Sequence, residues 1–349
     1  MFFASDNAGP AHPKVMDALI AANQGYASGY GADAPMVEVR QMIRDIFEAP
    51  DAAVHLVATG TAANALTLAT LSNPWEAIFC TPMAHIHEDE CNAPEFYTGG
   101  AKLALVEAVD AKMTAPTLLA AIESEETRGV HGPQRGPVSI TQATEKGTVY
   151  TTAELMALTD VAHAFGLKTH LDGARFTNAL VSLGCTPAEM TWKAGIDAVS
   201  FGGTKNGLIG VEACIFFDPA VSKQFELRRK RGAHLFSKHR YLSAQMHAYL
   251  TDNLWLDMAR QANAACARLI RGLEDVPQVE IQFSPQSNLV FFTAPRSVHQ
   301  RALKAGAVYY VMGGDPDTGP DDERLTGRLV CDWSCDHGAI DRFIAHLKP

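Results

Sequence analysis

In the stretch Val54-His55-Leu56-Val57-Ala58-Thr59-Gly60-Thr61-Ala62-Ala63-Asn64, a short apolar run passes through a turn of small residues into a run of helix formers. Residues 54–58 have the length and composition of a buried strand, and residues 61–71 have those of a helix. A strand that leads directly into a helix is the repeating unit of a parallel sheet with crossover helices. The stretch therefore predicts an α/β fold.

The same alternation continues through the first three quarters of the chain. Further apolar runs predict strands at 77–80, 102–106, 138–142, 167–171, 198–201 and 213–217. A helix is predicted at 151–165, because Thr151 and Glu154 have the spacing of a capping box. From about Ser237 the pattern predicts a long helical segment through Leu273. Short strands at 279–283, 289–293 and 328–331 and helices at 298–305 and from 339 are predicted after it.

The length of 349 residues suggests about two domains, at roughly 150 residues per domain. We expect a large α/β domain at 1–250 with a mostly parallel central sheet. A smaller α+β domain is expected at 251–349, with the first residues of the chain packed on it. The loop at 313–322 has the composition of a mobile segment.

Composition and charge argue against several classes of protein. The chain is 47% hydrophobic and 19% charged, as in globular proteins, and its formal net charge of −10 disfavours binding to nucleic acid or anionic lipid. The most apolar run, 208–217, is too short to span a bilayer and contains Glu212. The first residues do not resemble a secretory signal, and 7 Cys in a chain of this length do not form a disulfide framework. We therefore expect a cytoplasmic protein with reduced thiols.

Three short motifs follow expected strands, where ligands collect in parallel α/β sheets. Thr59-Gly60-Thr61 has the exposed N–H groups of a phosphate site, although many strand-to-helix turns look alike. Asp172 ends one strand and could equally be a helix cap. Lys205 lies among small residues in Phe201-Gly202-Gly203-Thr204-Lys205-Asn206-Gly207, where a buried amine is plausible, although lysines are usually exposed.

Together these three motifs match the requirements of pyridoxal phosphate. The Thr59–Thr61 turn would hold the phosphate, Asp172 would keep the pyridine nitrogen protonated, and Lys205 would form the Schiff base. The 33 residues between Asp172 and Lys205 leave room for one crossover helix and the next strand, so both side chains can face one crevice. The sequence thus predicts a pyridoxal-phosphate enzyme.

The sequence resembles the threonine aldolases of the β-eliminating lyase group, in particular the low-specificity L-threonine and phenylserine aldolases, which are fold-type-I pyridoxal-phosphate enzymes. The resemblance covers at least residues 5–328. It rests on Ser5-Asp6-Asn7, Tyr30-Gly31-Ala32-Asp33, the 59–64 turn, Ala84-His85, Asp89-Glu90-Cys91-Asn92-Ala93-Pro94-Glu95-Phe96, Asp172-Gly173-Ala174-Arg175 and the Lys205 segment. The stretch 182–195 further resembles the phenylserine-aldolase branch.

The resemblance implies a fold and a cofactor site. The fold is of the fold-type-I pyridoxal-phosphate transferase kind, with a smaller C-terminal α+β domain. Lys205 and Asp172 are implied as catalytic residues, and His85 stacks on the cofactor ring. The implied cofactor ligands are Gly60, Thr61, His85, Asp172, Arg175, Thr204 and Lys205, with Lys230 and Arg240 reaching the phosphate of a neighbouring subunit.

The resemblance also implies a reaction, its substrate site and an assembly. The reaction is retro-aldol cleavage of L-β-hydroxy-α-amino acids, namely threonine, allo-threonine or phenylserine, to glycine and an aldehyde. Ser5, Tyr30, Arg175 and Arg328 are implied substrate-binding residues, and a guanidinium suits a carboxylate. The assembly is a homodimer or homotetramer with active sites at the dimer interface.

The sequence departs from the family pattern at one position. Many threonine aldolases have a histidine before an Asn-Gly turn, and Glu145 stands at the matching place. We therefore expect His85 to act as the base, through a water held by Glu90. Such a base contributes about 10²–10⁴ in rate.

Alternatives to aldol cleavage stay open at this point. The same lysine and aspartate serve β-elimination and transamination. The donor-rich stretches Cys331-x3-Cys335-x-His337 and His85-x-His87 could suggest a metal, but neither has a usual zinc spacing, so we expect none. A protein that kept the fold without turnover is the third alternative.

Overall fold

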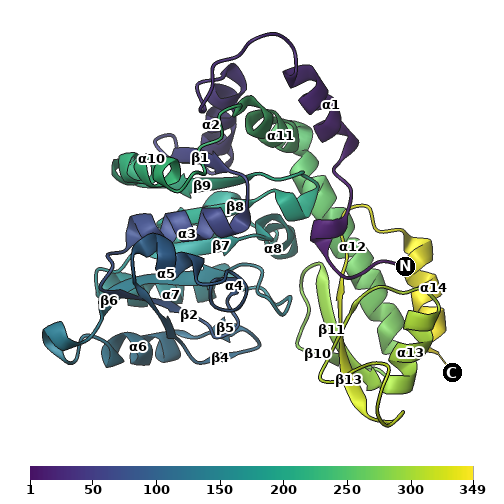
Figure 1. Cartoon of the computed structure of the whole chain (residues 1–349). Coiled ribbons are helices and arrows are strands. Elements are labelled where there is room, and N and C mark those ends of the chain that lie inside the picture. The colour runs from purple at the N-terminus through teal and green to yellow at the C-terminus, as the bar shows by residue number, and fades with distance from the viewer. Residues whose placement is uncertain (349) are drawn as a thin grey trace.

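The computed structural model describes residues 1–348, and its largest element is a seven-stranded sheet (Figure 1). In spatial order its strands are β1 (Ala53–Val57), β9 (Glu212–Phe216), β8 (Ala198–Gly202), β7 (Thr169–Gly173), β6 (Gln134–Thr141), β2 (Glu76–Cys80) and β3 (Lys102–Leu105). The pairs from β8 to β3 are parallel, whereas β9 is antiparallel to both of its neighbours. The expected mostly parallel sheet is confirmed.

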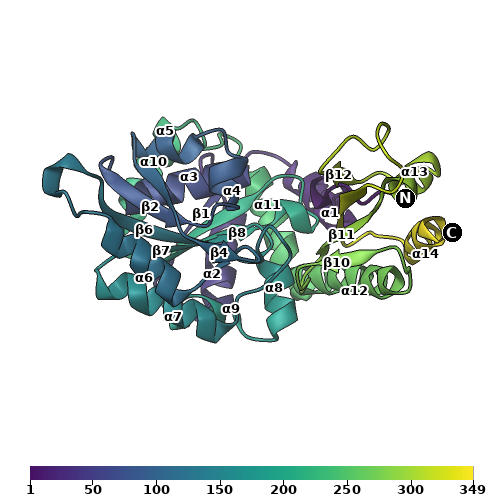
Figure 2. The ribbon, with the colours of Figure 1, turned by 90° about the horizontal axis from the view of Figure 1, so that it is seen from below.

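Helices cover both faces of this sheet. Figure 2 shows α3 (Gly60–Leu71), α5 (Ala93–Thr98) and α10 (Ser222–Arg231) on one face, and α6 (Ala115–Ser124), α7 (Thr152–Ala164) and α9 (Pro187–Met190) on the other. The predicted capping box begins α7, since the Thr151 hydroxyl accepts from the Glu154 N–H and the Glu154 carboxylate accepts from the Thr151 N–H. Both faces of the strands are thereby buried.

Six further α-helices lie between Pro13 and Glu274. They are α1 (Pro13–Ala22), α2 (Ala34–Ile46), α4 (His85–Glu88), α8 (Phe176–Leu183), α11 (Arg240–Leu250) and α12 (Leu254–Glu274). Within residues 1–348, no helix combines the length and the apolar character needed to cross a membrane.

The long helical segment predicted at 237–273 is helical over most of its length, but it is divided. The chain forms two helices, α11 and α12, because Asp252 and Asn253 between them have positive φ angles of 53° and 57°. Asp and Asn adopt this left-handed conformation more readily than most residues, and it interrupts the helical hydrogen-bond ladder. The break lets α12 turn away along the second sheet (Figure 1).

The second sheet is antiparallel and has four strands. Its order is β10 (Glu280–Gln282), β11 (Leu289–Pro295), β13 (Arg324–Val330) and β12 (Tyr310–Met312), and α12, α13 (Arg296–Lys304) and α14 (His337–Leu347) pack with it. A two-stranded ribbon, β4 (Ala108–Val109) and β5 (Lys112–Met113), stands apart. The strand β12 was not predicted, and the domain boundary at residue 250 stays a prediction.

The N-terminal segment lies against the second sheet. Phe2 forms a parallel bridge with Val308, and the ring of Phe3 lies 5.1 Å from that of Phe343. Figure 1 shows both chain ends on this side of the molecule. The segment then continues through the 3-10 helix η1 (Asp6–Ala8), which brings residues 5–7 between the two sheets.

Candidate active site

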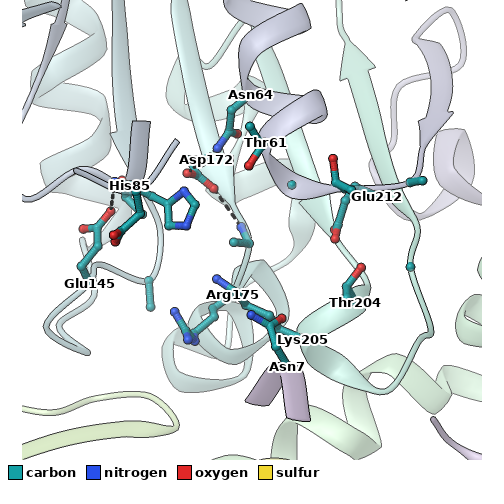
Figure 3. A pocket seen from close by; sticks show the side chains of 18 of the residues that line it. Asn7, Thr61, Asn64, His85, Glu145, Asp172, Arg175, Thr204, Lys205 and Glu212 are labelled. Atoms are coloured by element: carbon teal, nitrogen blue, oxygen red, sulfur yellow. Dashed lines mark hydrogen bonds between the residues drawn. The ribbon is translucent and has the colours of Figure 1, made fainter. Parts of the chain in front are cut away.

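A cavity of about 470 Å³ lies at the carboxyl ends of the parallel strands (Figure 3). It is lined by seven of the residues predicted for the site, namely Gly60, Thr61, His85, Asp172, Arg175, Thr204 and Lys205. These residues follow four different strands or begin the helices after them. The topology thus brings the three sequence motifs into one site, as the sequence predicted.

The first turn of α3 forms one end of the cavity. Thr59 caps the helix through its hydroxyl, which accepts from the Ala62 N–H at 3.2 Å. The Gly60 and Thr61 N–H groups belong to the first turn, where a helix offers them no acceptor. A Cβ atom at Gly60 would meet no atom within 4 Å, so the space in front of these groups is open. This end of the cavity suits an anion.

Asp172 is fixed by two hydrogen bonds at the end of β7. Its Oδ1 accepts from the Ala174 N–H at 3.0 Å, and its Oδ2 accepts from the Asn64 side chain at 2.8 Å. The residue is 2% exposed. Asn64 comes from α3 and also donates to Glu90 Oε1 at 2.9 Å. The carboxylate therefore has a fixed position in the cavity wall, and Asn64 is a positioning residue that the sequence did not identify.

Lys205 lies in the short turn after β8, is partly buried and lines the cavity. A Cβ atom at Gly202 would lie 2.7 Å from the Gly173 carbonyl oxygen, so only glycine allows β8 to approach β7 so closely before the turn. Burial, followed by the nearby Arg175 guanidinium, lowers the pKa of Lys205, and Asp6, Asp172 and Glu212 oppose that shift. A lowered pKa favours the neutral amine, which is the nucleophilic form.

His85 points its ring into the cavity (Figure 3) and is held by Glu90. The distance from His85 Nδ1 to Glu90 Oε1 is 2.8 Å, and the Glu90 side chain is fully buried. The hydrogen bond to Glu90 raises the pKa of His85, against the opposing effect of burial. Because Nδ1 is engaged by Glu90, Nε2 is the ring nitrogen available to a ligand.

Arg175 has a buried partner that the sequence did not predict. Its Nε donates to Asp6 Oδ2 at 2.7 Å and its Nη2 donates to Asp6 Oδ1 at 3.0 Å. Asp6 also accepts from the Asn288 side chain at 3.1 Å. Burial alone would raise the pKa of Asp6, but the Arg175 charge and its hydrogen bonds lower it. The Nη1 hydrogens and the second Nη2 hydrogen of the guanidinium are left for a ligand.

Ser5 and Arg328 lie outside the set of residues that line this cavity. The Ser5 hydroxyl accepts from the Asn7 N–H at 3.1 Å, and Arg328 Nη1 donates to the Ala4 carbonyl at 3.1 Å. Burial, and then the nearby charge of Arg175, lower the pKa of Arg328. The predicted contact of Ser5 and Arg328 with substrate stays a prediction.

Tyr30, Lys230 and Arg240 lie away from the residues that line this cavity. Lys230 Nζ lies 5.0 Å from the centre of the Tyr30 ring, and Arg240 Nη1 donates to the Gly25 carbonyl at 2.9 Å. None of the three lines the cavity of its own chain among the described residues. Their predicted role toward a neighbouring subunit stays a prediction.

Comparison with known proteins identifies the family. The model of the family described as beta-eliminating lyase matches residues 3–295. The chain belongs to the beta-eliminating lyase family. A low specificity L-threonine aldolase of Pseudomonas sp. (strain NCIMB 10558) is 37% identical over 348 residues, which are 99% of this chain and 96% of the relative. A protein of the same name from Pseudomonas aeruginosa is 38% identical over 336 residues, 96% of this chain and 93% of its own length.

A solved structure supports the same assignment. The threonine aldolase of Leishmania major superposes with a TM-score of 0.91 at 27% identity, over 99% of this chain and 98% of that one. The predicted fold-type-I architecture is confirmed. Pyridoxal phosphate is the cofactor of the beta-eliminating lyase family, as the sequence motifs predicted.

The residues present fit this cofactor. The open first turn of α3 offers N–H donors for a phosphate, the fixed carboxylate of Asp172 offers an acceptor for a protonated ring nitrogen, and Lys205 offers a buried amine. All three belong to the wall of one cavity.

Besides the exposed Asp89, two further carboxyls line the cavity of this family member. Glu145 Oε1 accepts from the His85 N–H at 2.9 Å, and burial raises its pKa to about 7. Glu212 Oε2 accepts from the Gly203 N–H at 2.7 Å, and burial raises its pKa to about 7 as well. Sequence reasoning assigned no role to either. For Glu212 the available signal was a single charge in an otherwise apolar run.

The two donor-rich stretches, at 85–87 and 331–337, lie within the residues that the structure describes. Across residues 1–348, the structure groups no three His, Cys, Asp or Glu side chains in a manner that could hold a metal ion. Cys331 is a buried free thiol and Cys335 a partly exposed one.

Proposed function

We propose that this enzyme cleaves L-β-hydroxy-α-amino acids, such as threonine, allo-threonine and phenylserine, to glycine and an aldehyde. The observation that carries the proposal is the position of Lys205, buried in the same cavity as Asp172 and His85. The names of the Pseudomonas relatives support a threonine aldolase reaction. The protein is a pyridoxal-phosphate-dependent lyase, and its choice of substrates is the part under proposal.

Bound pyridoxal phosphate supplies an aldehyde that condenses with amines and a ring that accepts the electron pair of a broken Cα bond. Gly60, Thr61 and Thr204 would hold the phosphate, and Asp172 would keep the ring nitrogen protonated. Lys205 would present its amine to the aldehyde, and burial, which lowers the pKa of this amine, favours its nucleophilic form.

His85 is the base in this proposal. Its Nε2 removes the proton of the substrate hydroxyl, and the Cα–Cβ bond then breaks as the hydroxyl becomes the carbonyl of the leaving aldehyde. Glu90 holds the ring through Nδ1 and stabilises the positive charge that the ring acquires. His85 and Glu90 together thus supply the base without a histidine at position 145, where the chain has Glu145.

Binding of the substrate carboxylate orients the bond that breaks. Arg175 offers its Nη1, and Arg328 lies near enough for its charge to act on Arg175. Ser5 belongs to the segment that carries Asp6, the partner of Arg175. A carboxylate held by these groups fixes the rotation of the substrate about its Cα atom.

We further propose a homodimer or a homotetramer, with active sites at the dimer interface. Tyr30, Lys230 and Arg240 are surface groups of one copy that suit the phosphate and substrate side of the other. A cytoplasmic location belongs to the same proposal and agrees with the seven free thiols.

The test incubates the purified holoenzyme with L-threonine, L-allo-threonine and phenylserine, and measures glycine, aldehyde, ammonia and keto acid. We expect equal amounts of glycine and aldehyde, no ammonia or keto acid, and loss of activity in Lys205→Ala. The matched control is Lys168→Ala, whose side chain pairs with Asp197 on the surface and should leave the activity unchanged. Ammonia with a keto acid as the main products would contradict the proposal and favour β-elimination or transamination.

A further inference from the structure

Glu212 is a buried carboxyl that the reaction proposed above leaves without a task. It begins β9, is 6% exposed, and lines the cavity together with Gly60, Thr61 and Thr204. Figure 3 shows Glu212 and Thr204 pointing toward one another beside the first turn of α3. The carboxyl therefore lies at the end of the cavity that is expected to receive a phosphate.

The hydrogen bonds of Glu212 compete with those of a phosphate. Its Oε2 accepts from the Gly203 N–H at 2.7 Å, and it also bonds to the hydroxyl of Thr204. The Val211 N–H donates to that same hydroxyl at 3.3 Å, so the hydroxyl hydrogen is the one directed at the carboxyl. While Glu212 is ionised, Thr204 donates to it and cannot donate to a phosphate oxygen.

Within one chain, the groups that face Glu212 include one cation and so do not balance both its charge and that of a phosphate. Lys205 is the cation that acts on it, whereas Tyr249 and Cys214 also face it and stay neutral, because burial raises the pKa of both. Burial raises the pKa of Glu212 itself to about 7 before any phosphate is present. A phosphate anion at the same end of the cavity raises this pKa further, because two like charges in a buried place disfavour each other.

We propose that Glu212 takes up one proton from solvent when the cofactor phosphate binds, so that the phosphate meets a neutral acid instead of a second anion. The neutral acid also releases the Thr204 hydroxyl to donate to the phosphate. The inference rests on cofactor binding as part of the proposed function, and it does not depend on which bond of the substrate is cleaved.

The test measures the affinity of the full-length apoprotein for pyridoxal phosphate between pH 6 and pH 9. One linked proton weakens binding about tenfold per pH unit above the pKa of the free carboxyl. We expect this loss in the native protein and in Glu145→Gln, the matched control, since Glu145 is a second buried cavity carboxyl whose pKa burial also raises to about 7. In Glu212→Gln we expect no such tenfold loss per pH unit. At pH 9 this variant should therefore bind pyridoxal phosphate up to about 100-fold more tightly than the native protein does.

Two further measurements test whether the proton taken up depends on Glu212 and on the cofactor phosphate. Pyridoxal, which lacks the phosphate, should bind the native protein and Glu212→Gln with the same pH dependence. Calorimetry of the native protein at pH 8, in buffers of different ionisation enthalpy, should show about one more proton taken up with pyridoxal phosphate than with pyridoxal. This measurement needs no variant, so it does not depend on whether Glu212→Gln folds.

The outcomes separate this inference from the proposed function. Identical pH dependence in the native protein and Glu212→Gln, an equal proton count for the two ligands, or loss of the proton in Glu145→Gln would each overturn the inference and leave aldol cleavage intact. Failure of the native protein to bind pyridoxal phosphate at any pH would instead overturn the proposed function.

Discussion

The buried pair of Asp6 and Arg175 should make a large contribution to stability, and Asp6→Asn is the change that tests it. The Asp6 side chain is fully buried, that of Arg175 is 8% exposed, and two hydrogen bonds of 2.7 and 3.0 Å join them. Asparagine keeps the shape and the contact with Asn288 but leaves the guanidinium without a counter-charge. Removing one partner of such a pair costs about 3–5 kcal/mol, because the remaining charge is buried and uncompensated.

The assay is urea unfolding of the holoenzyme at fixed protein concentration, followed by far-UV circular dichroism at pH 7. We expect Asp6→Asn to unfold with a free energy about 3–5 kcal/mol below that of the native protein. The double variant Asp6→Asn with Arg175→Met removes both charges and should recover most of this loss, since no charge is left buried alone.

The pH dependence of the free energy of unfolding tests the same pair independently. The Arg175 charge holds the pKa of Asp6 below its ordinary value of 3.8, despite the opposing effect of burial. A carboxyl whose folded pKa is lowered stabilises the fold above its unfolded pKa, and that stabilisation is lost as the pH falls through the folded value. The advantage of the native protein over Asp6→Asn should therefore shrink below about pH 4. A difference under about 1 kcal/mol at pH 7 would refute the reasoning, since it lies below the cost of any unpaired buried charge.

Three other predictions concern the base and a helix cap. His85→Asn should lower kcat by about 10²–10⁴-fold while the cofactor stays bound, as checked by steady-state kinetics and absorbance; an unchanged kcat would exclude His85 as the base. Glu90→Gln should move the acid limb of kcat/KM to lower pH, because the hydrogen bond that raises the pKa of His85 is lost; a limb that stays in place would contradict this. Thr151→Ala should cost about 1 kcal/mol in urea unfolding without changing kcat, because it removes the cap of α7; no loss of stability would show that the capping box contributes nothing.

The strands of the large sheet could be predicted because each is a short, buried apolar run between turn residues. The direction of β9 could have been predicted as well. The connection between β8 and β9, residues 203–211, is shorter than the dozen or more residues that a parallel crossover needs. The helix break at Asp252 and Asn253 had a weaker signal, since both residue types also occur inside helices and only their backbone angles decide.

The site could be predicted where its residues follow strands, because the carboxyl ends of parallel strands meet at one edge. Lys205, Asp172 and the 59–61 turn were found in this way. The partners that hold them were not, since Asp6 bonds to a residue 169 positions away and Asn64 to one 108 positions away. No local pattern in the sequence specifies such pairs, which depend on how η1 and α3 pack against the ends of the strands.

The Asp6 pair also bears on how a substrate carboxylate can be held. Asp6 accepts from Nε and from one Nη2 hydrogen of Arg175, so the edge formed by Nη1 and the second Nη2 hydrogen stays available. Arg328 donates to the Ala4 carbonyl through Nη1, and this contact does not use its Nε and Nη2 edge. Under the proposed function, each arginine therefore keeps an edge with two N–H donors for the substrate carboxylate. Its position then depends on Asp6 and on the Ala4 carbonyl, which belong to the same N-terminal segment, so a shift of that segment moves both donors together.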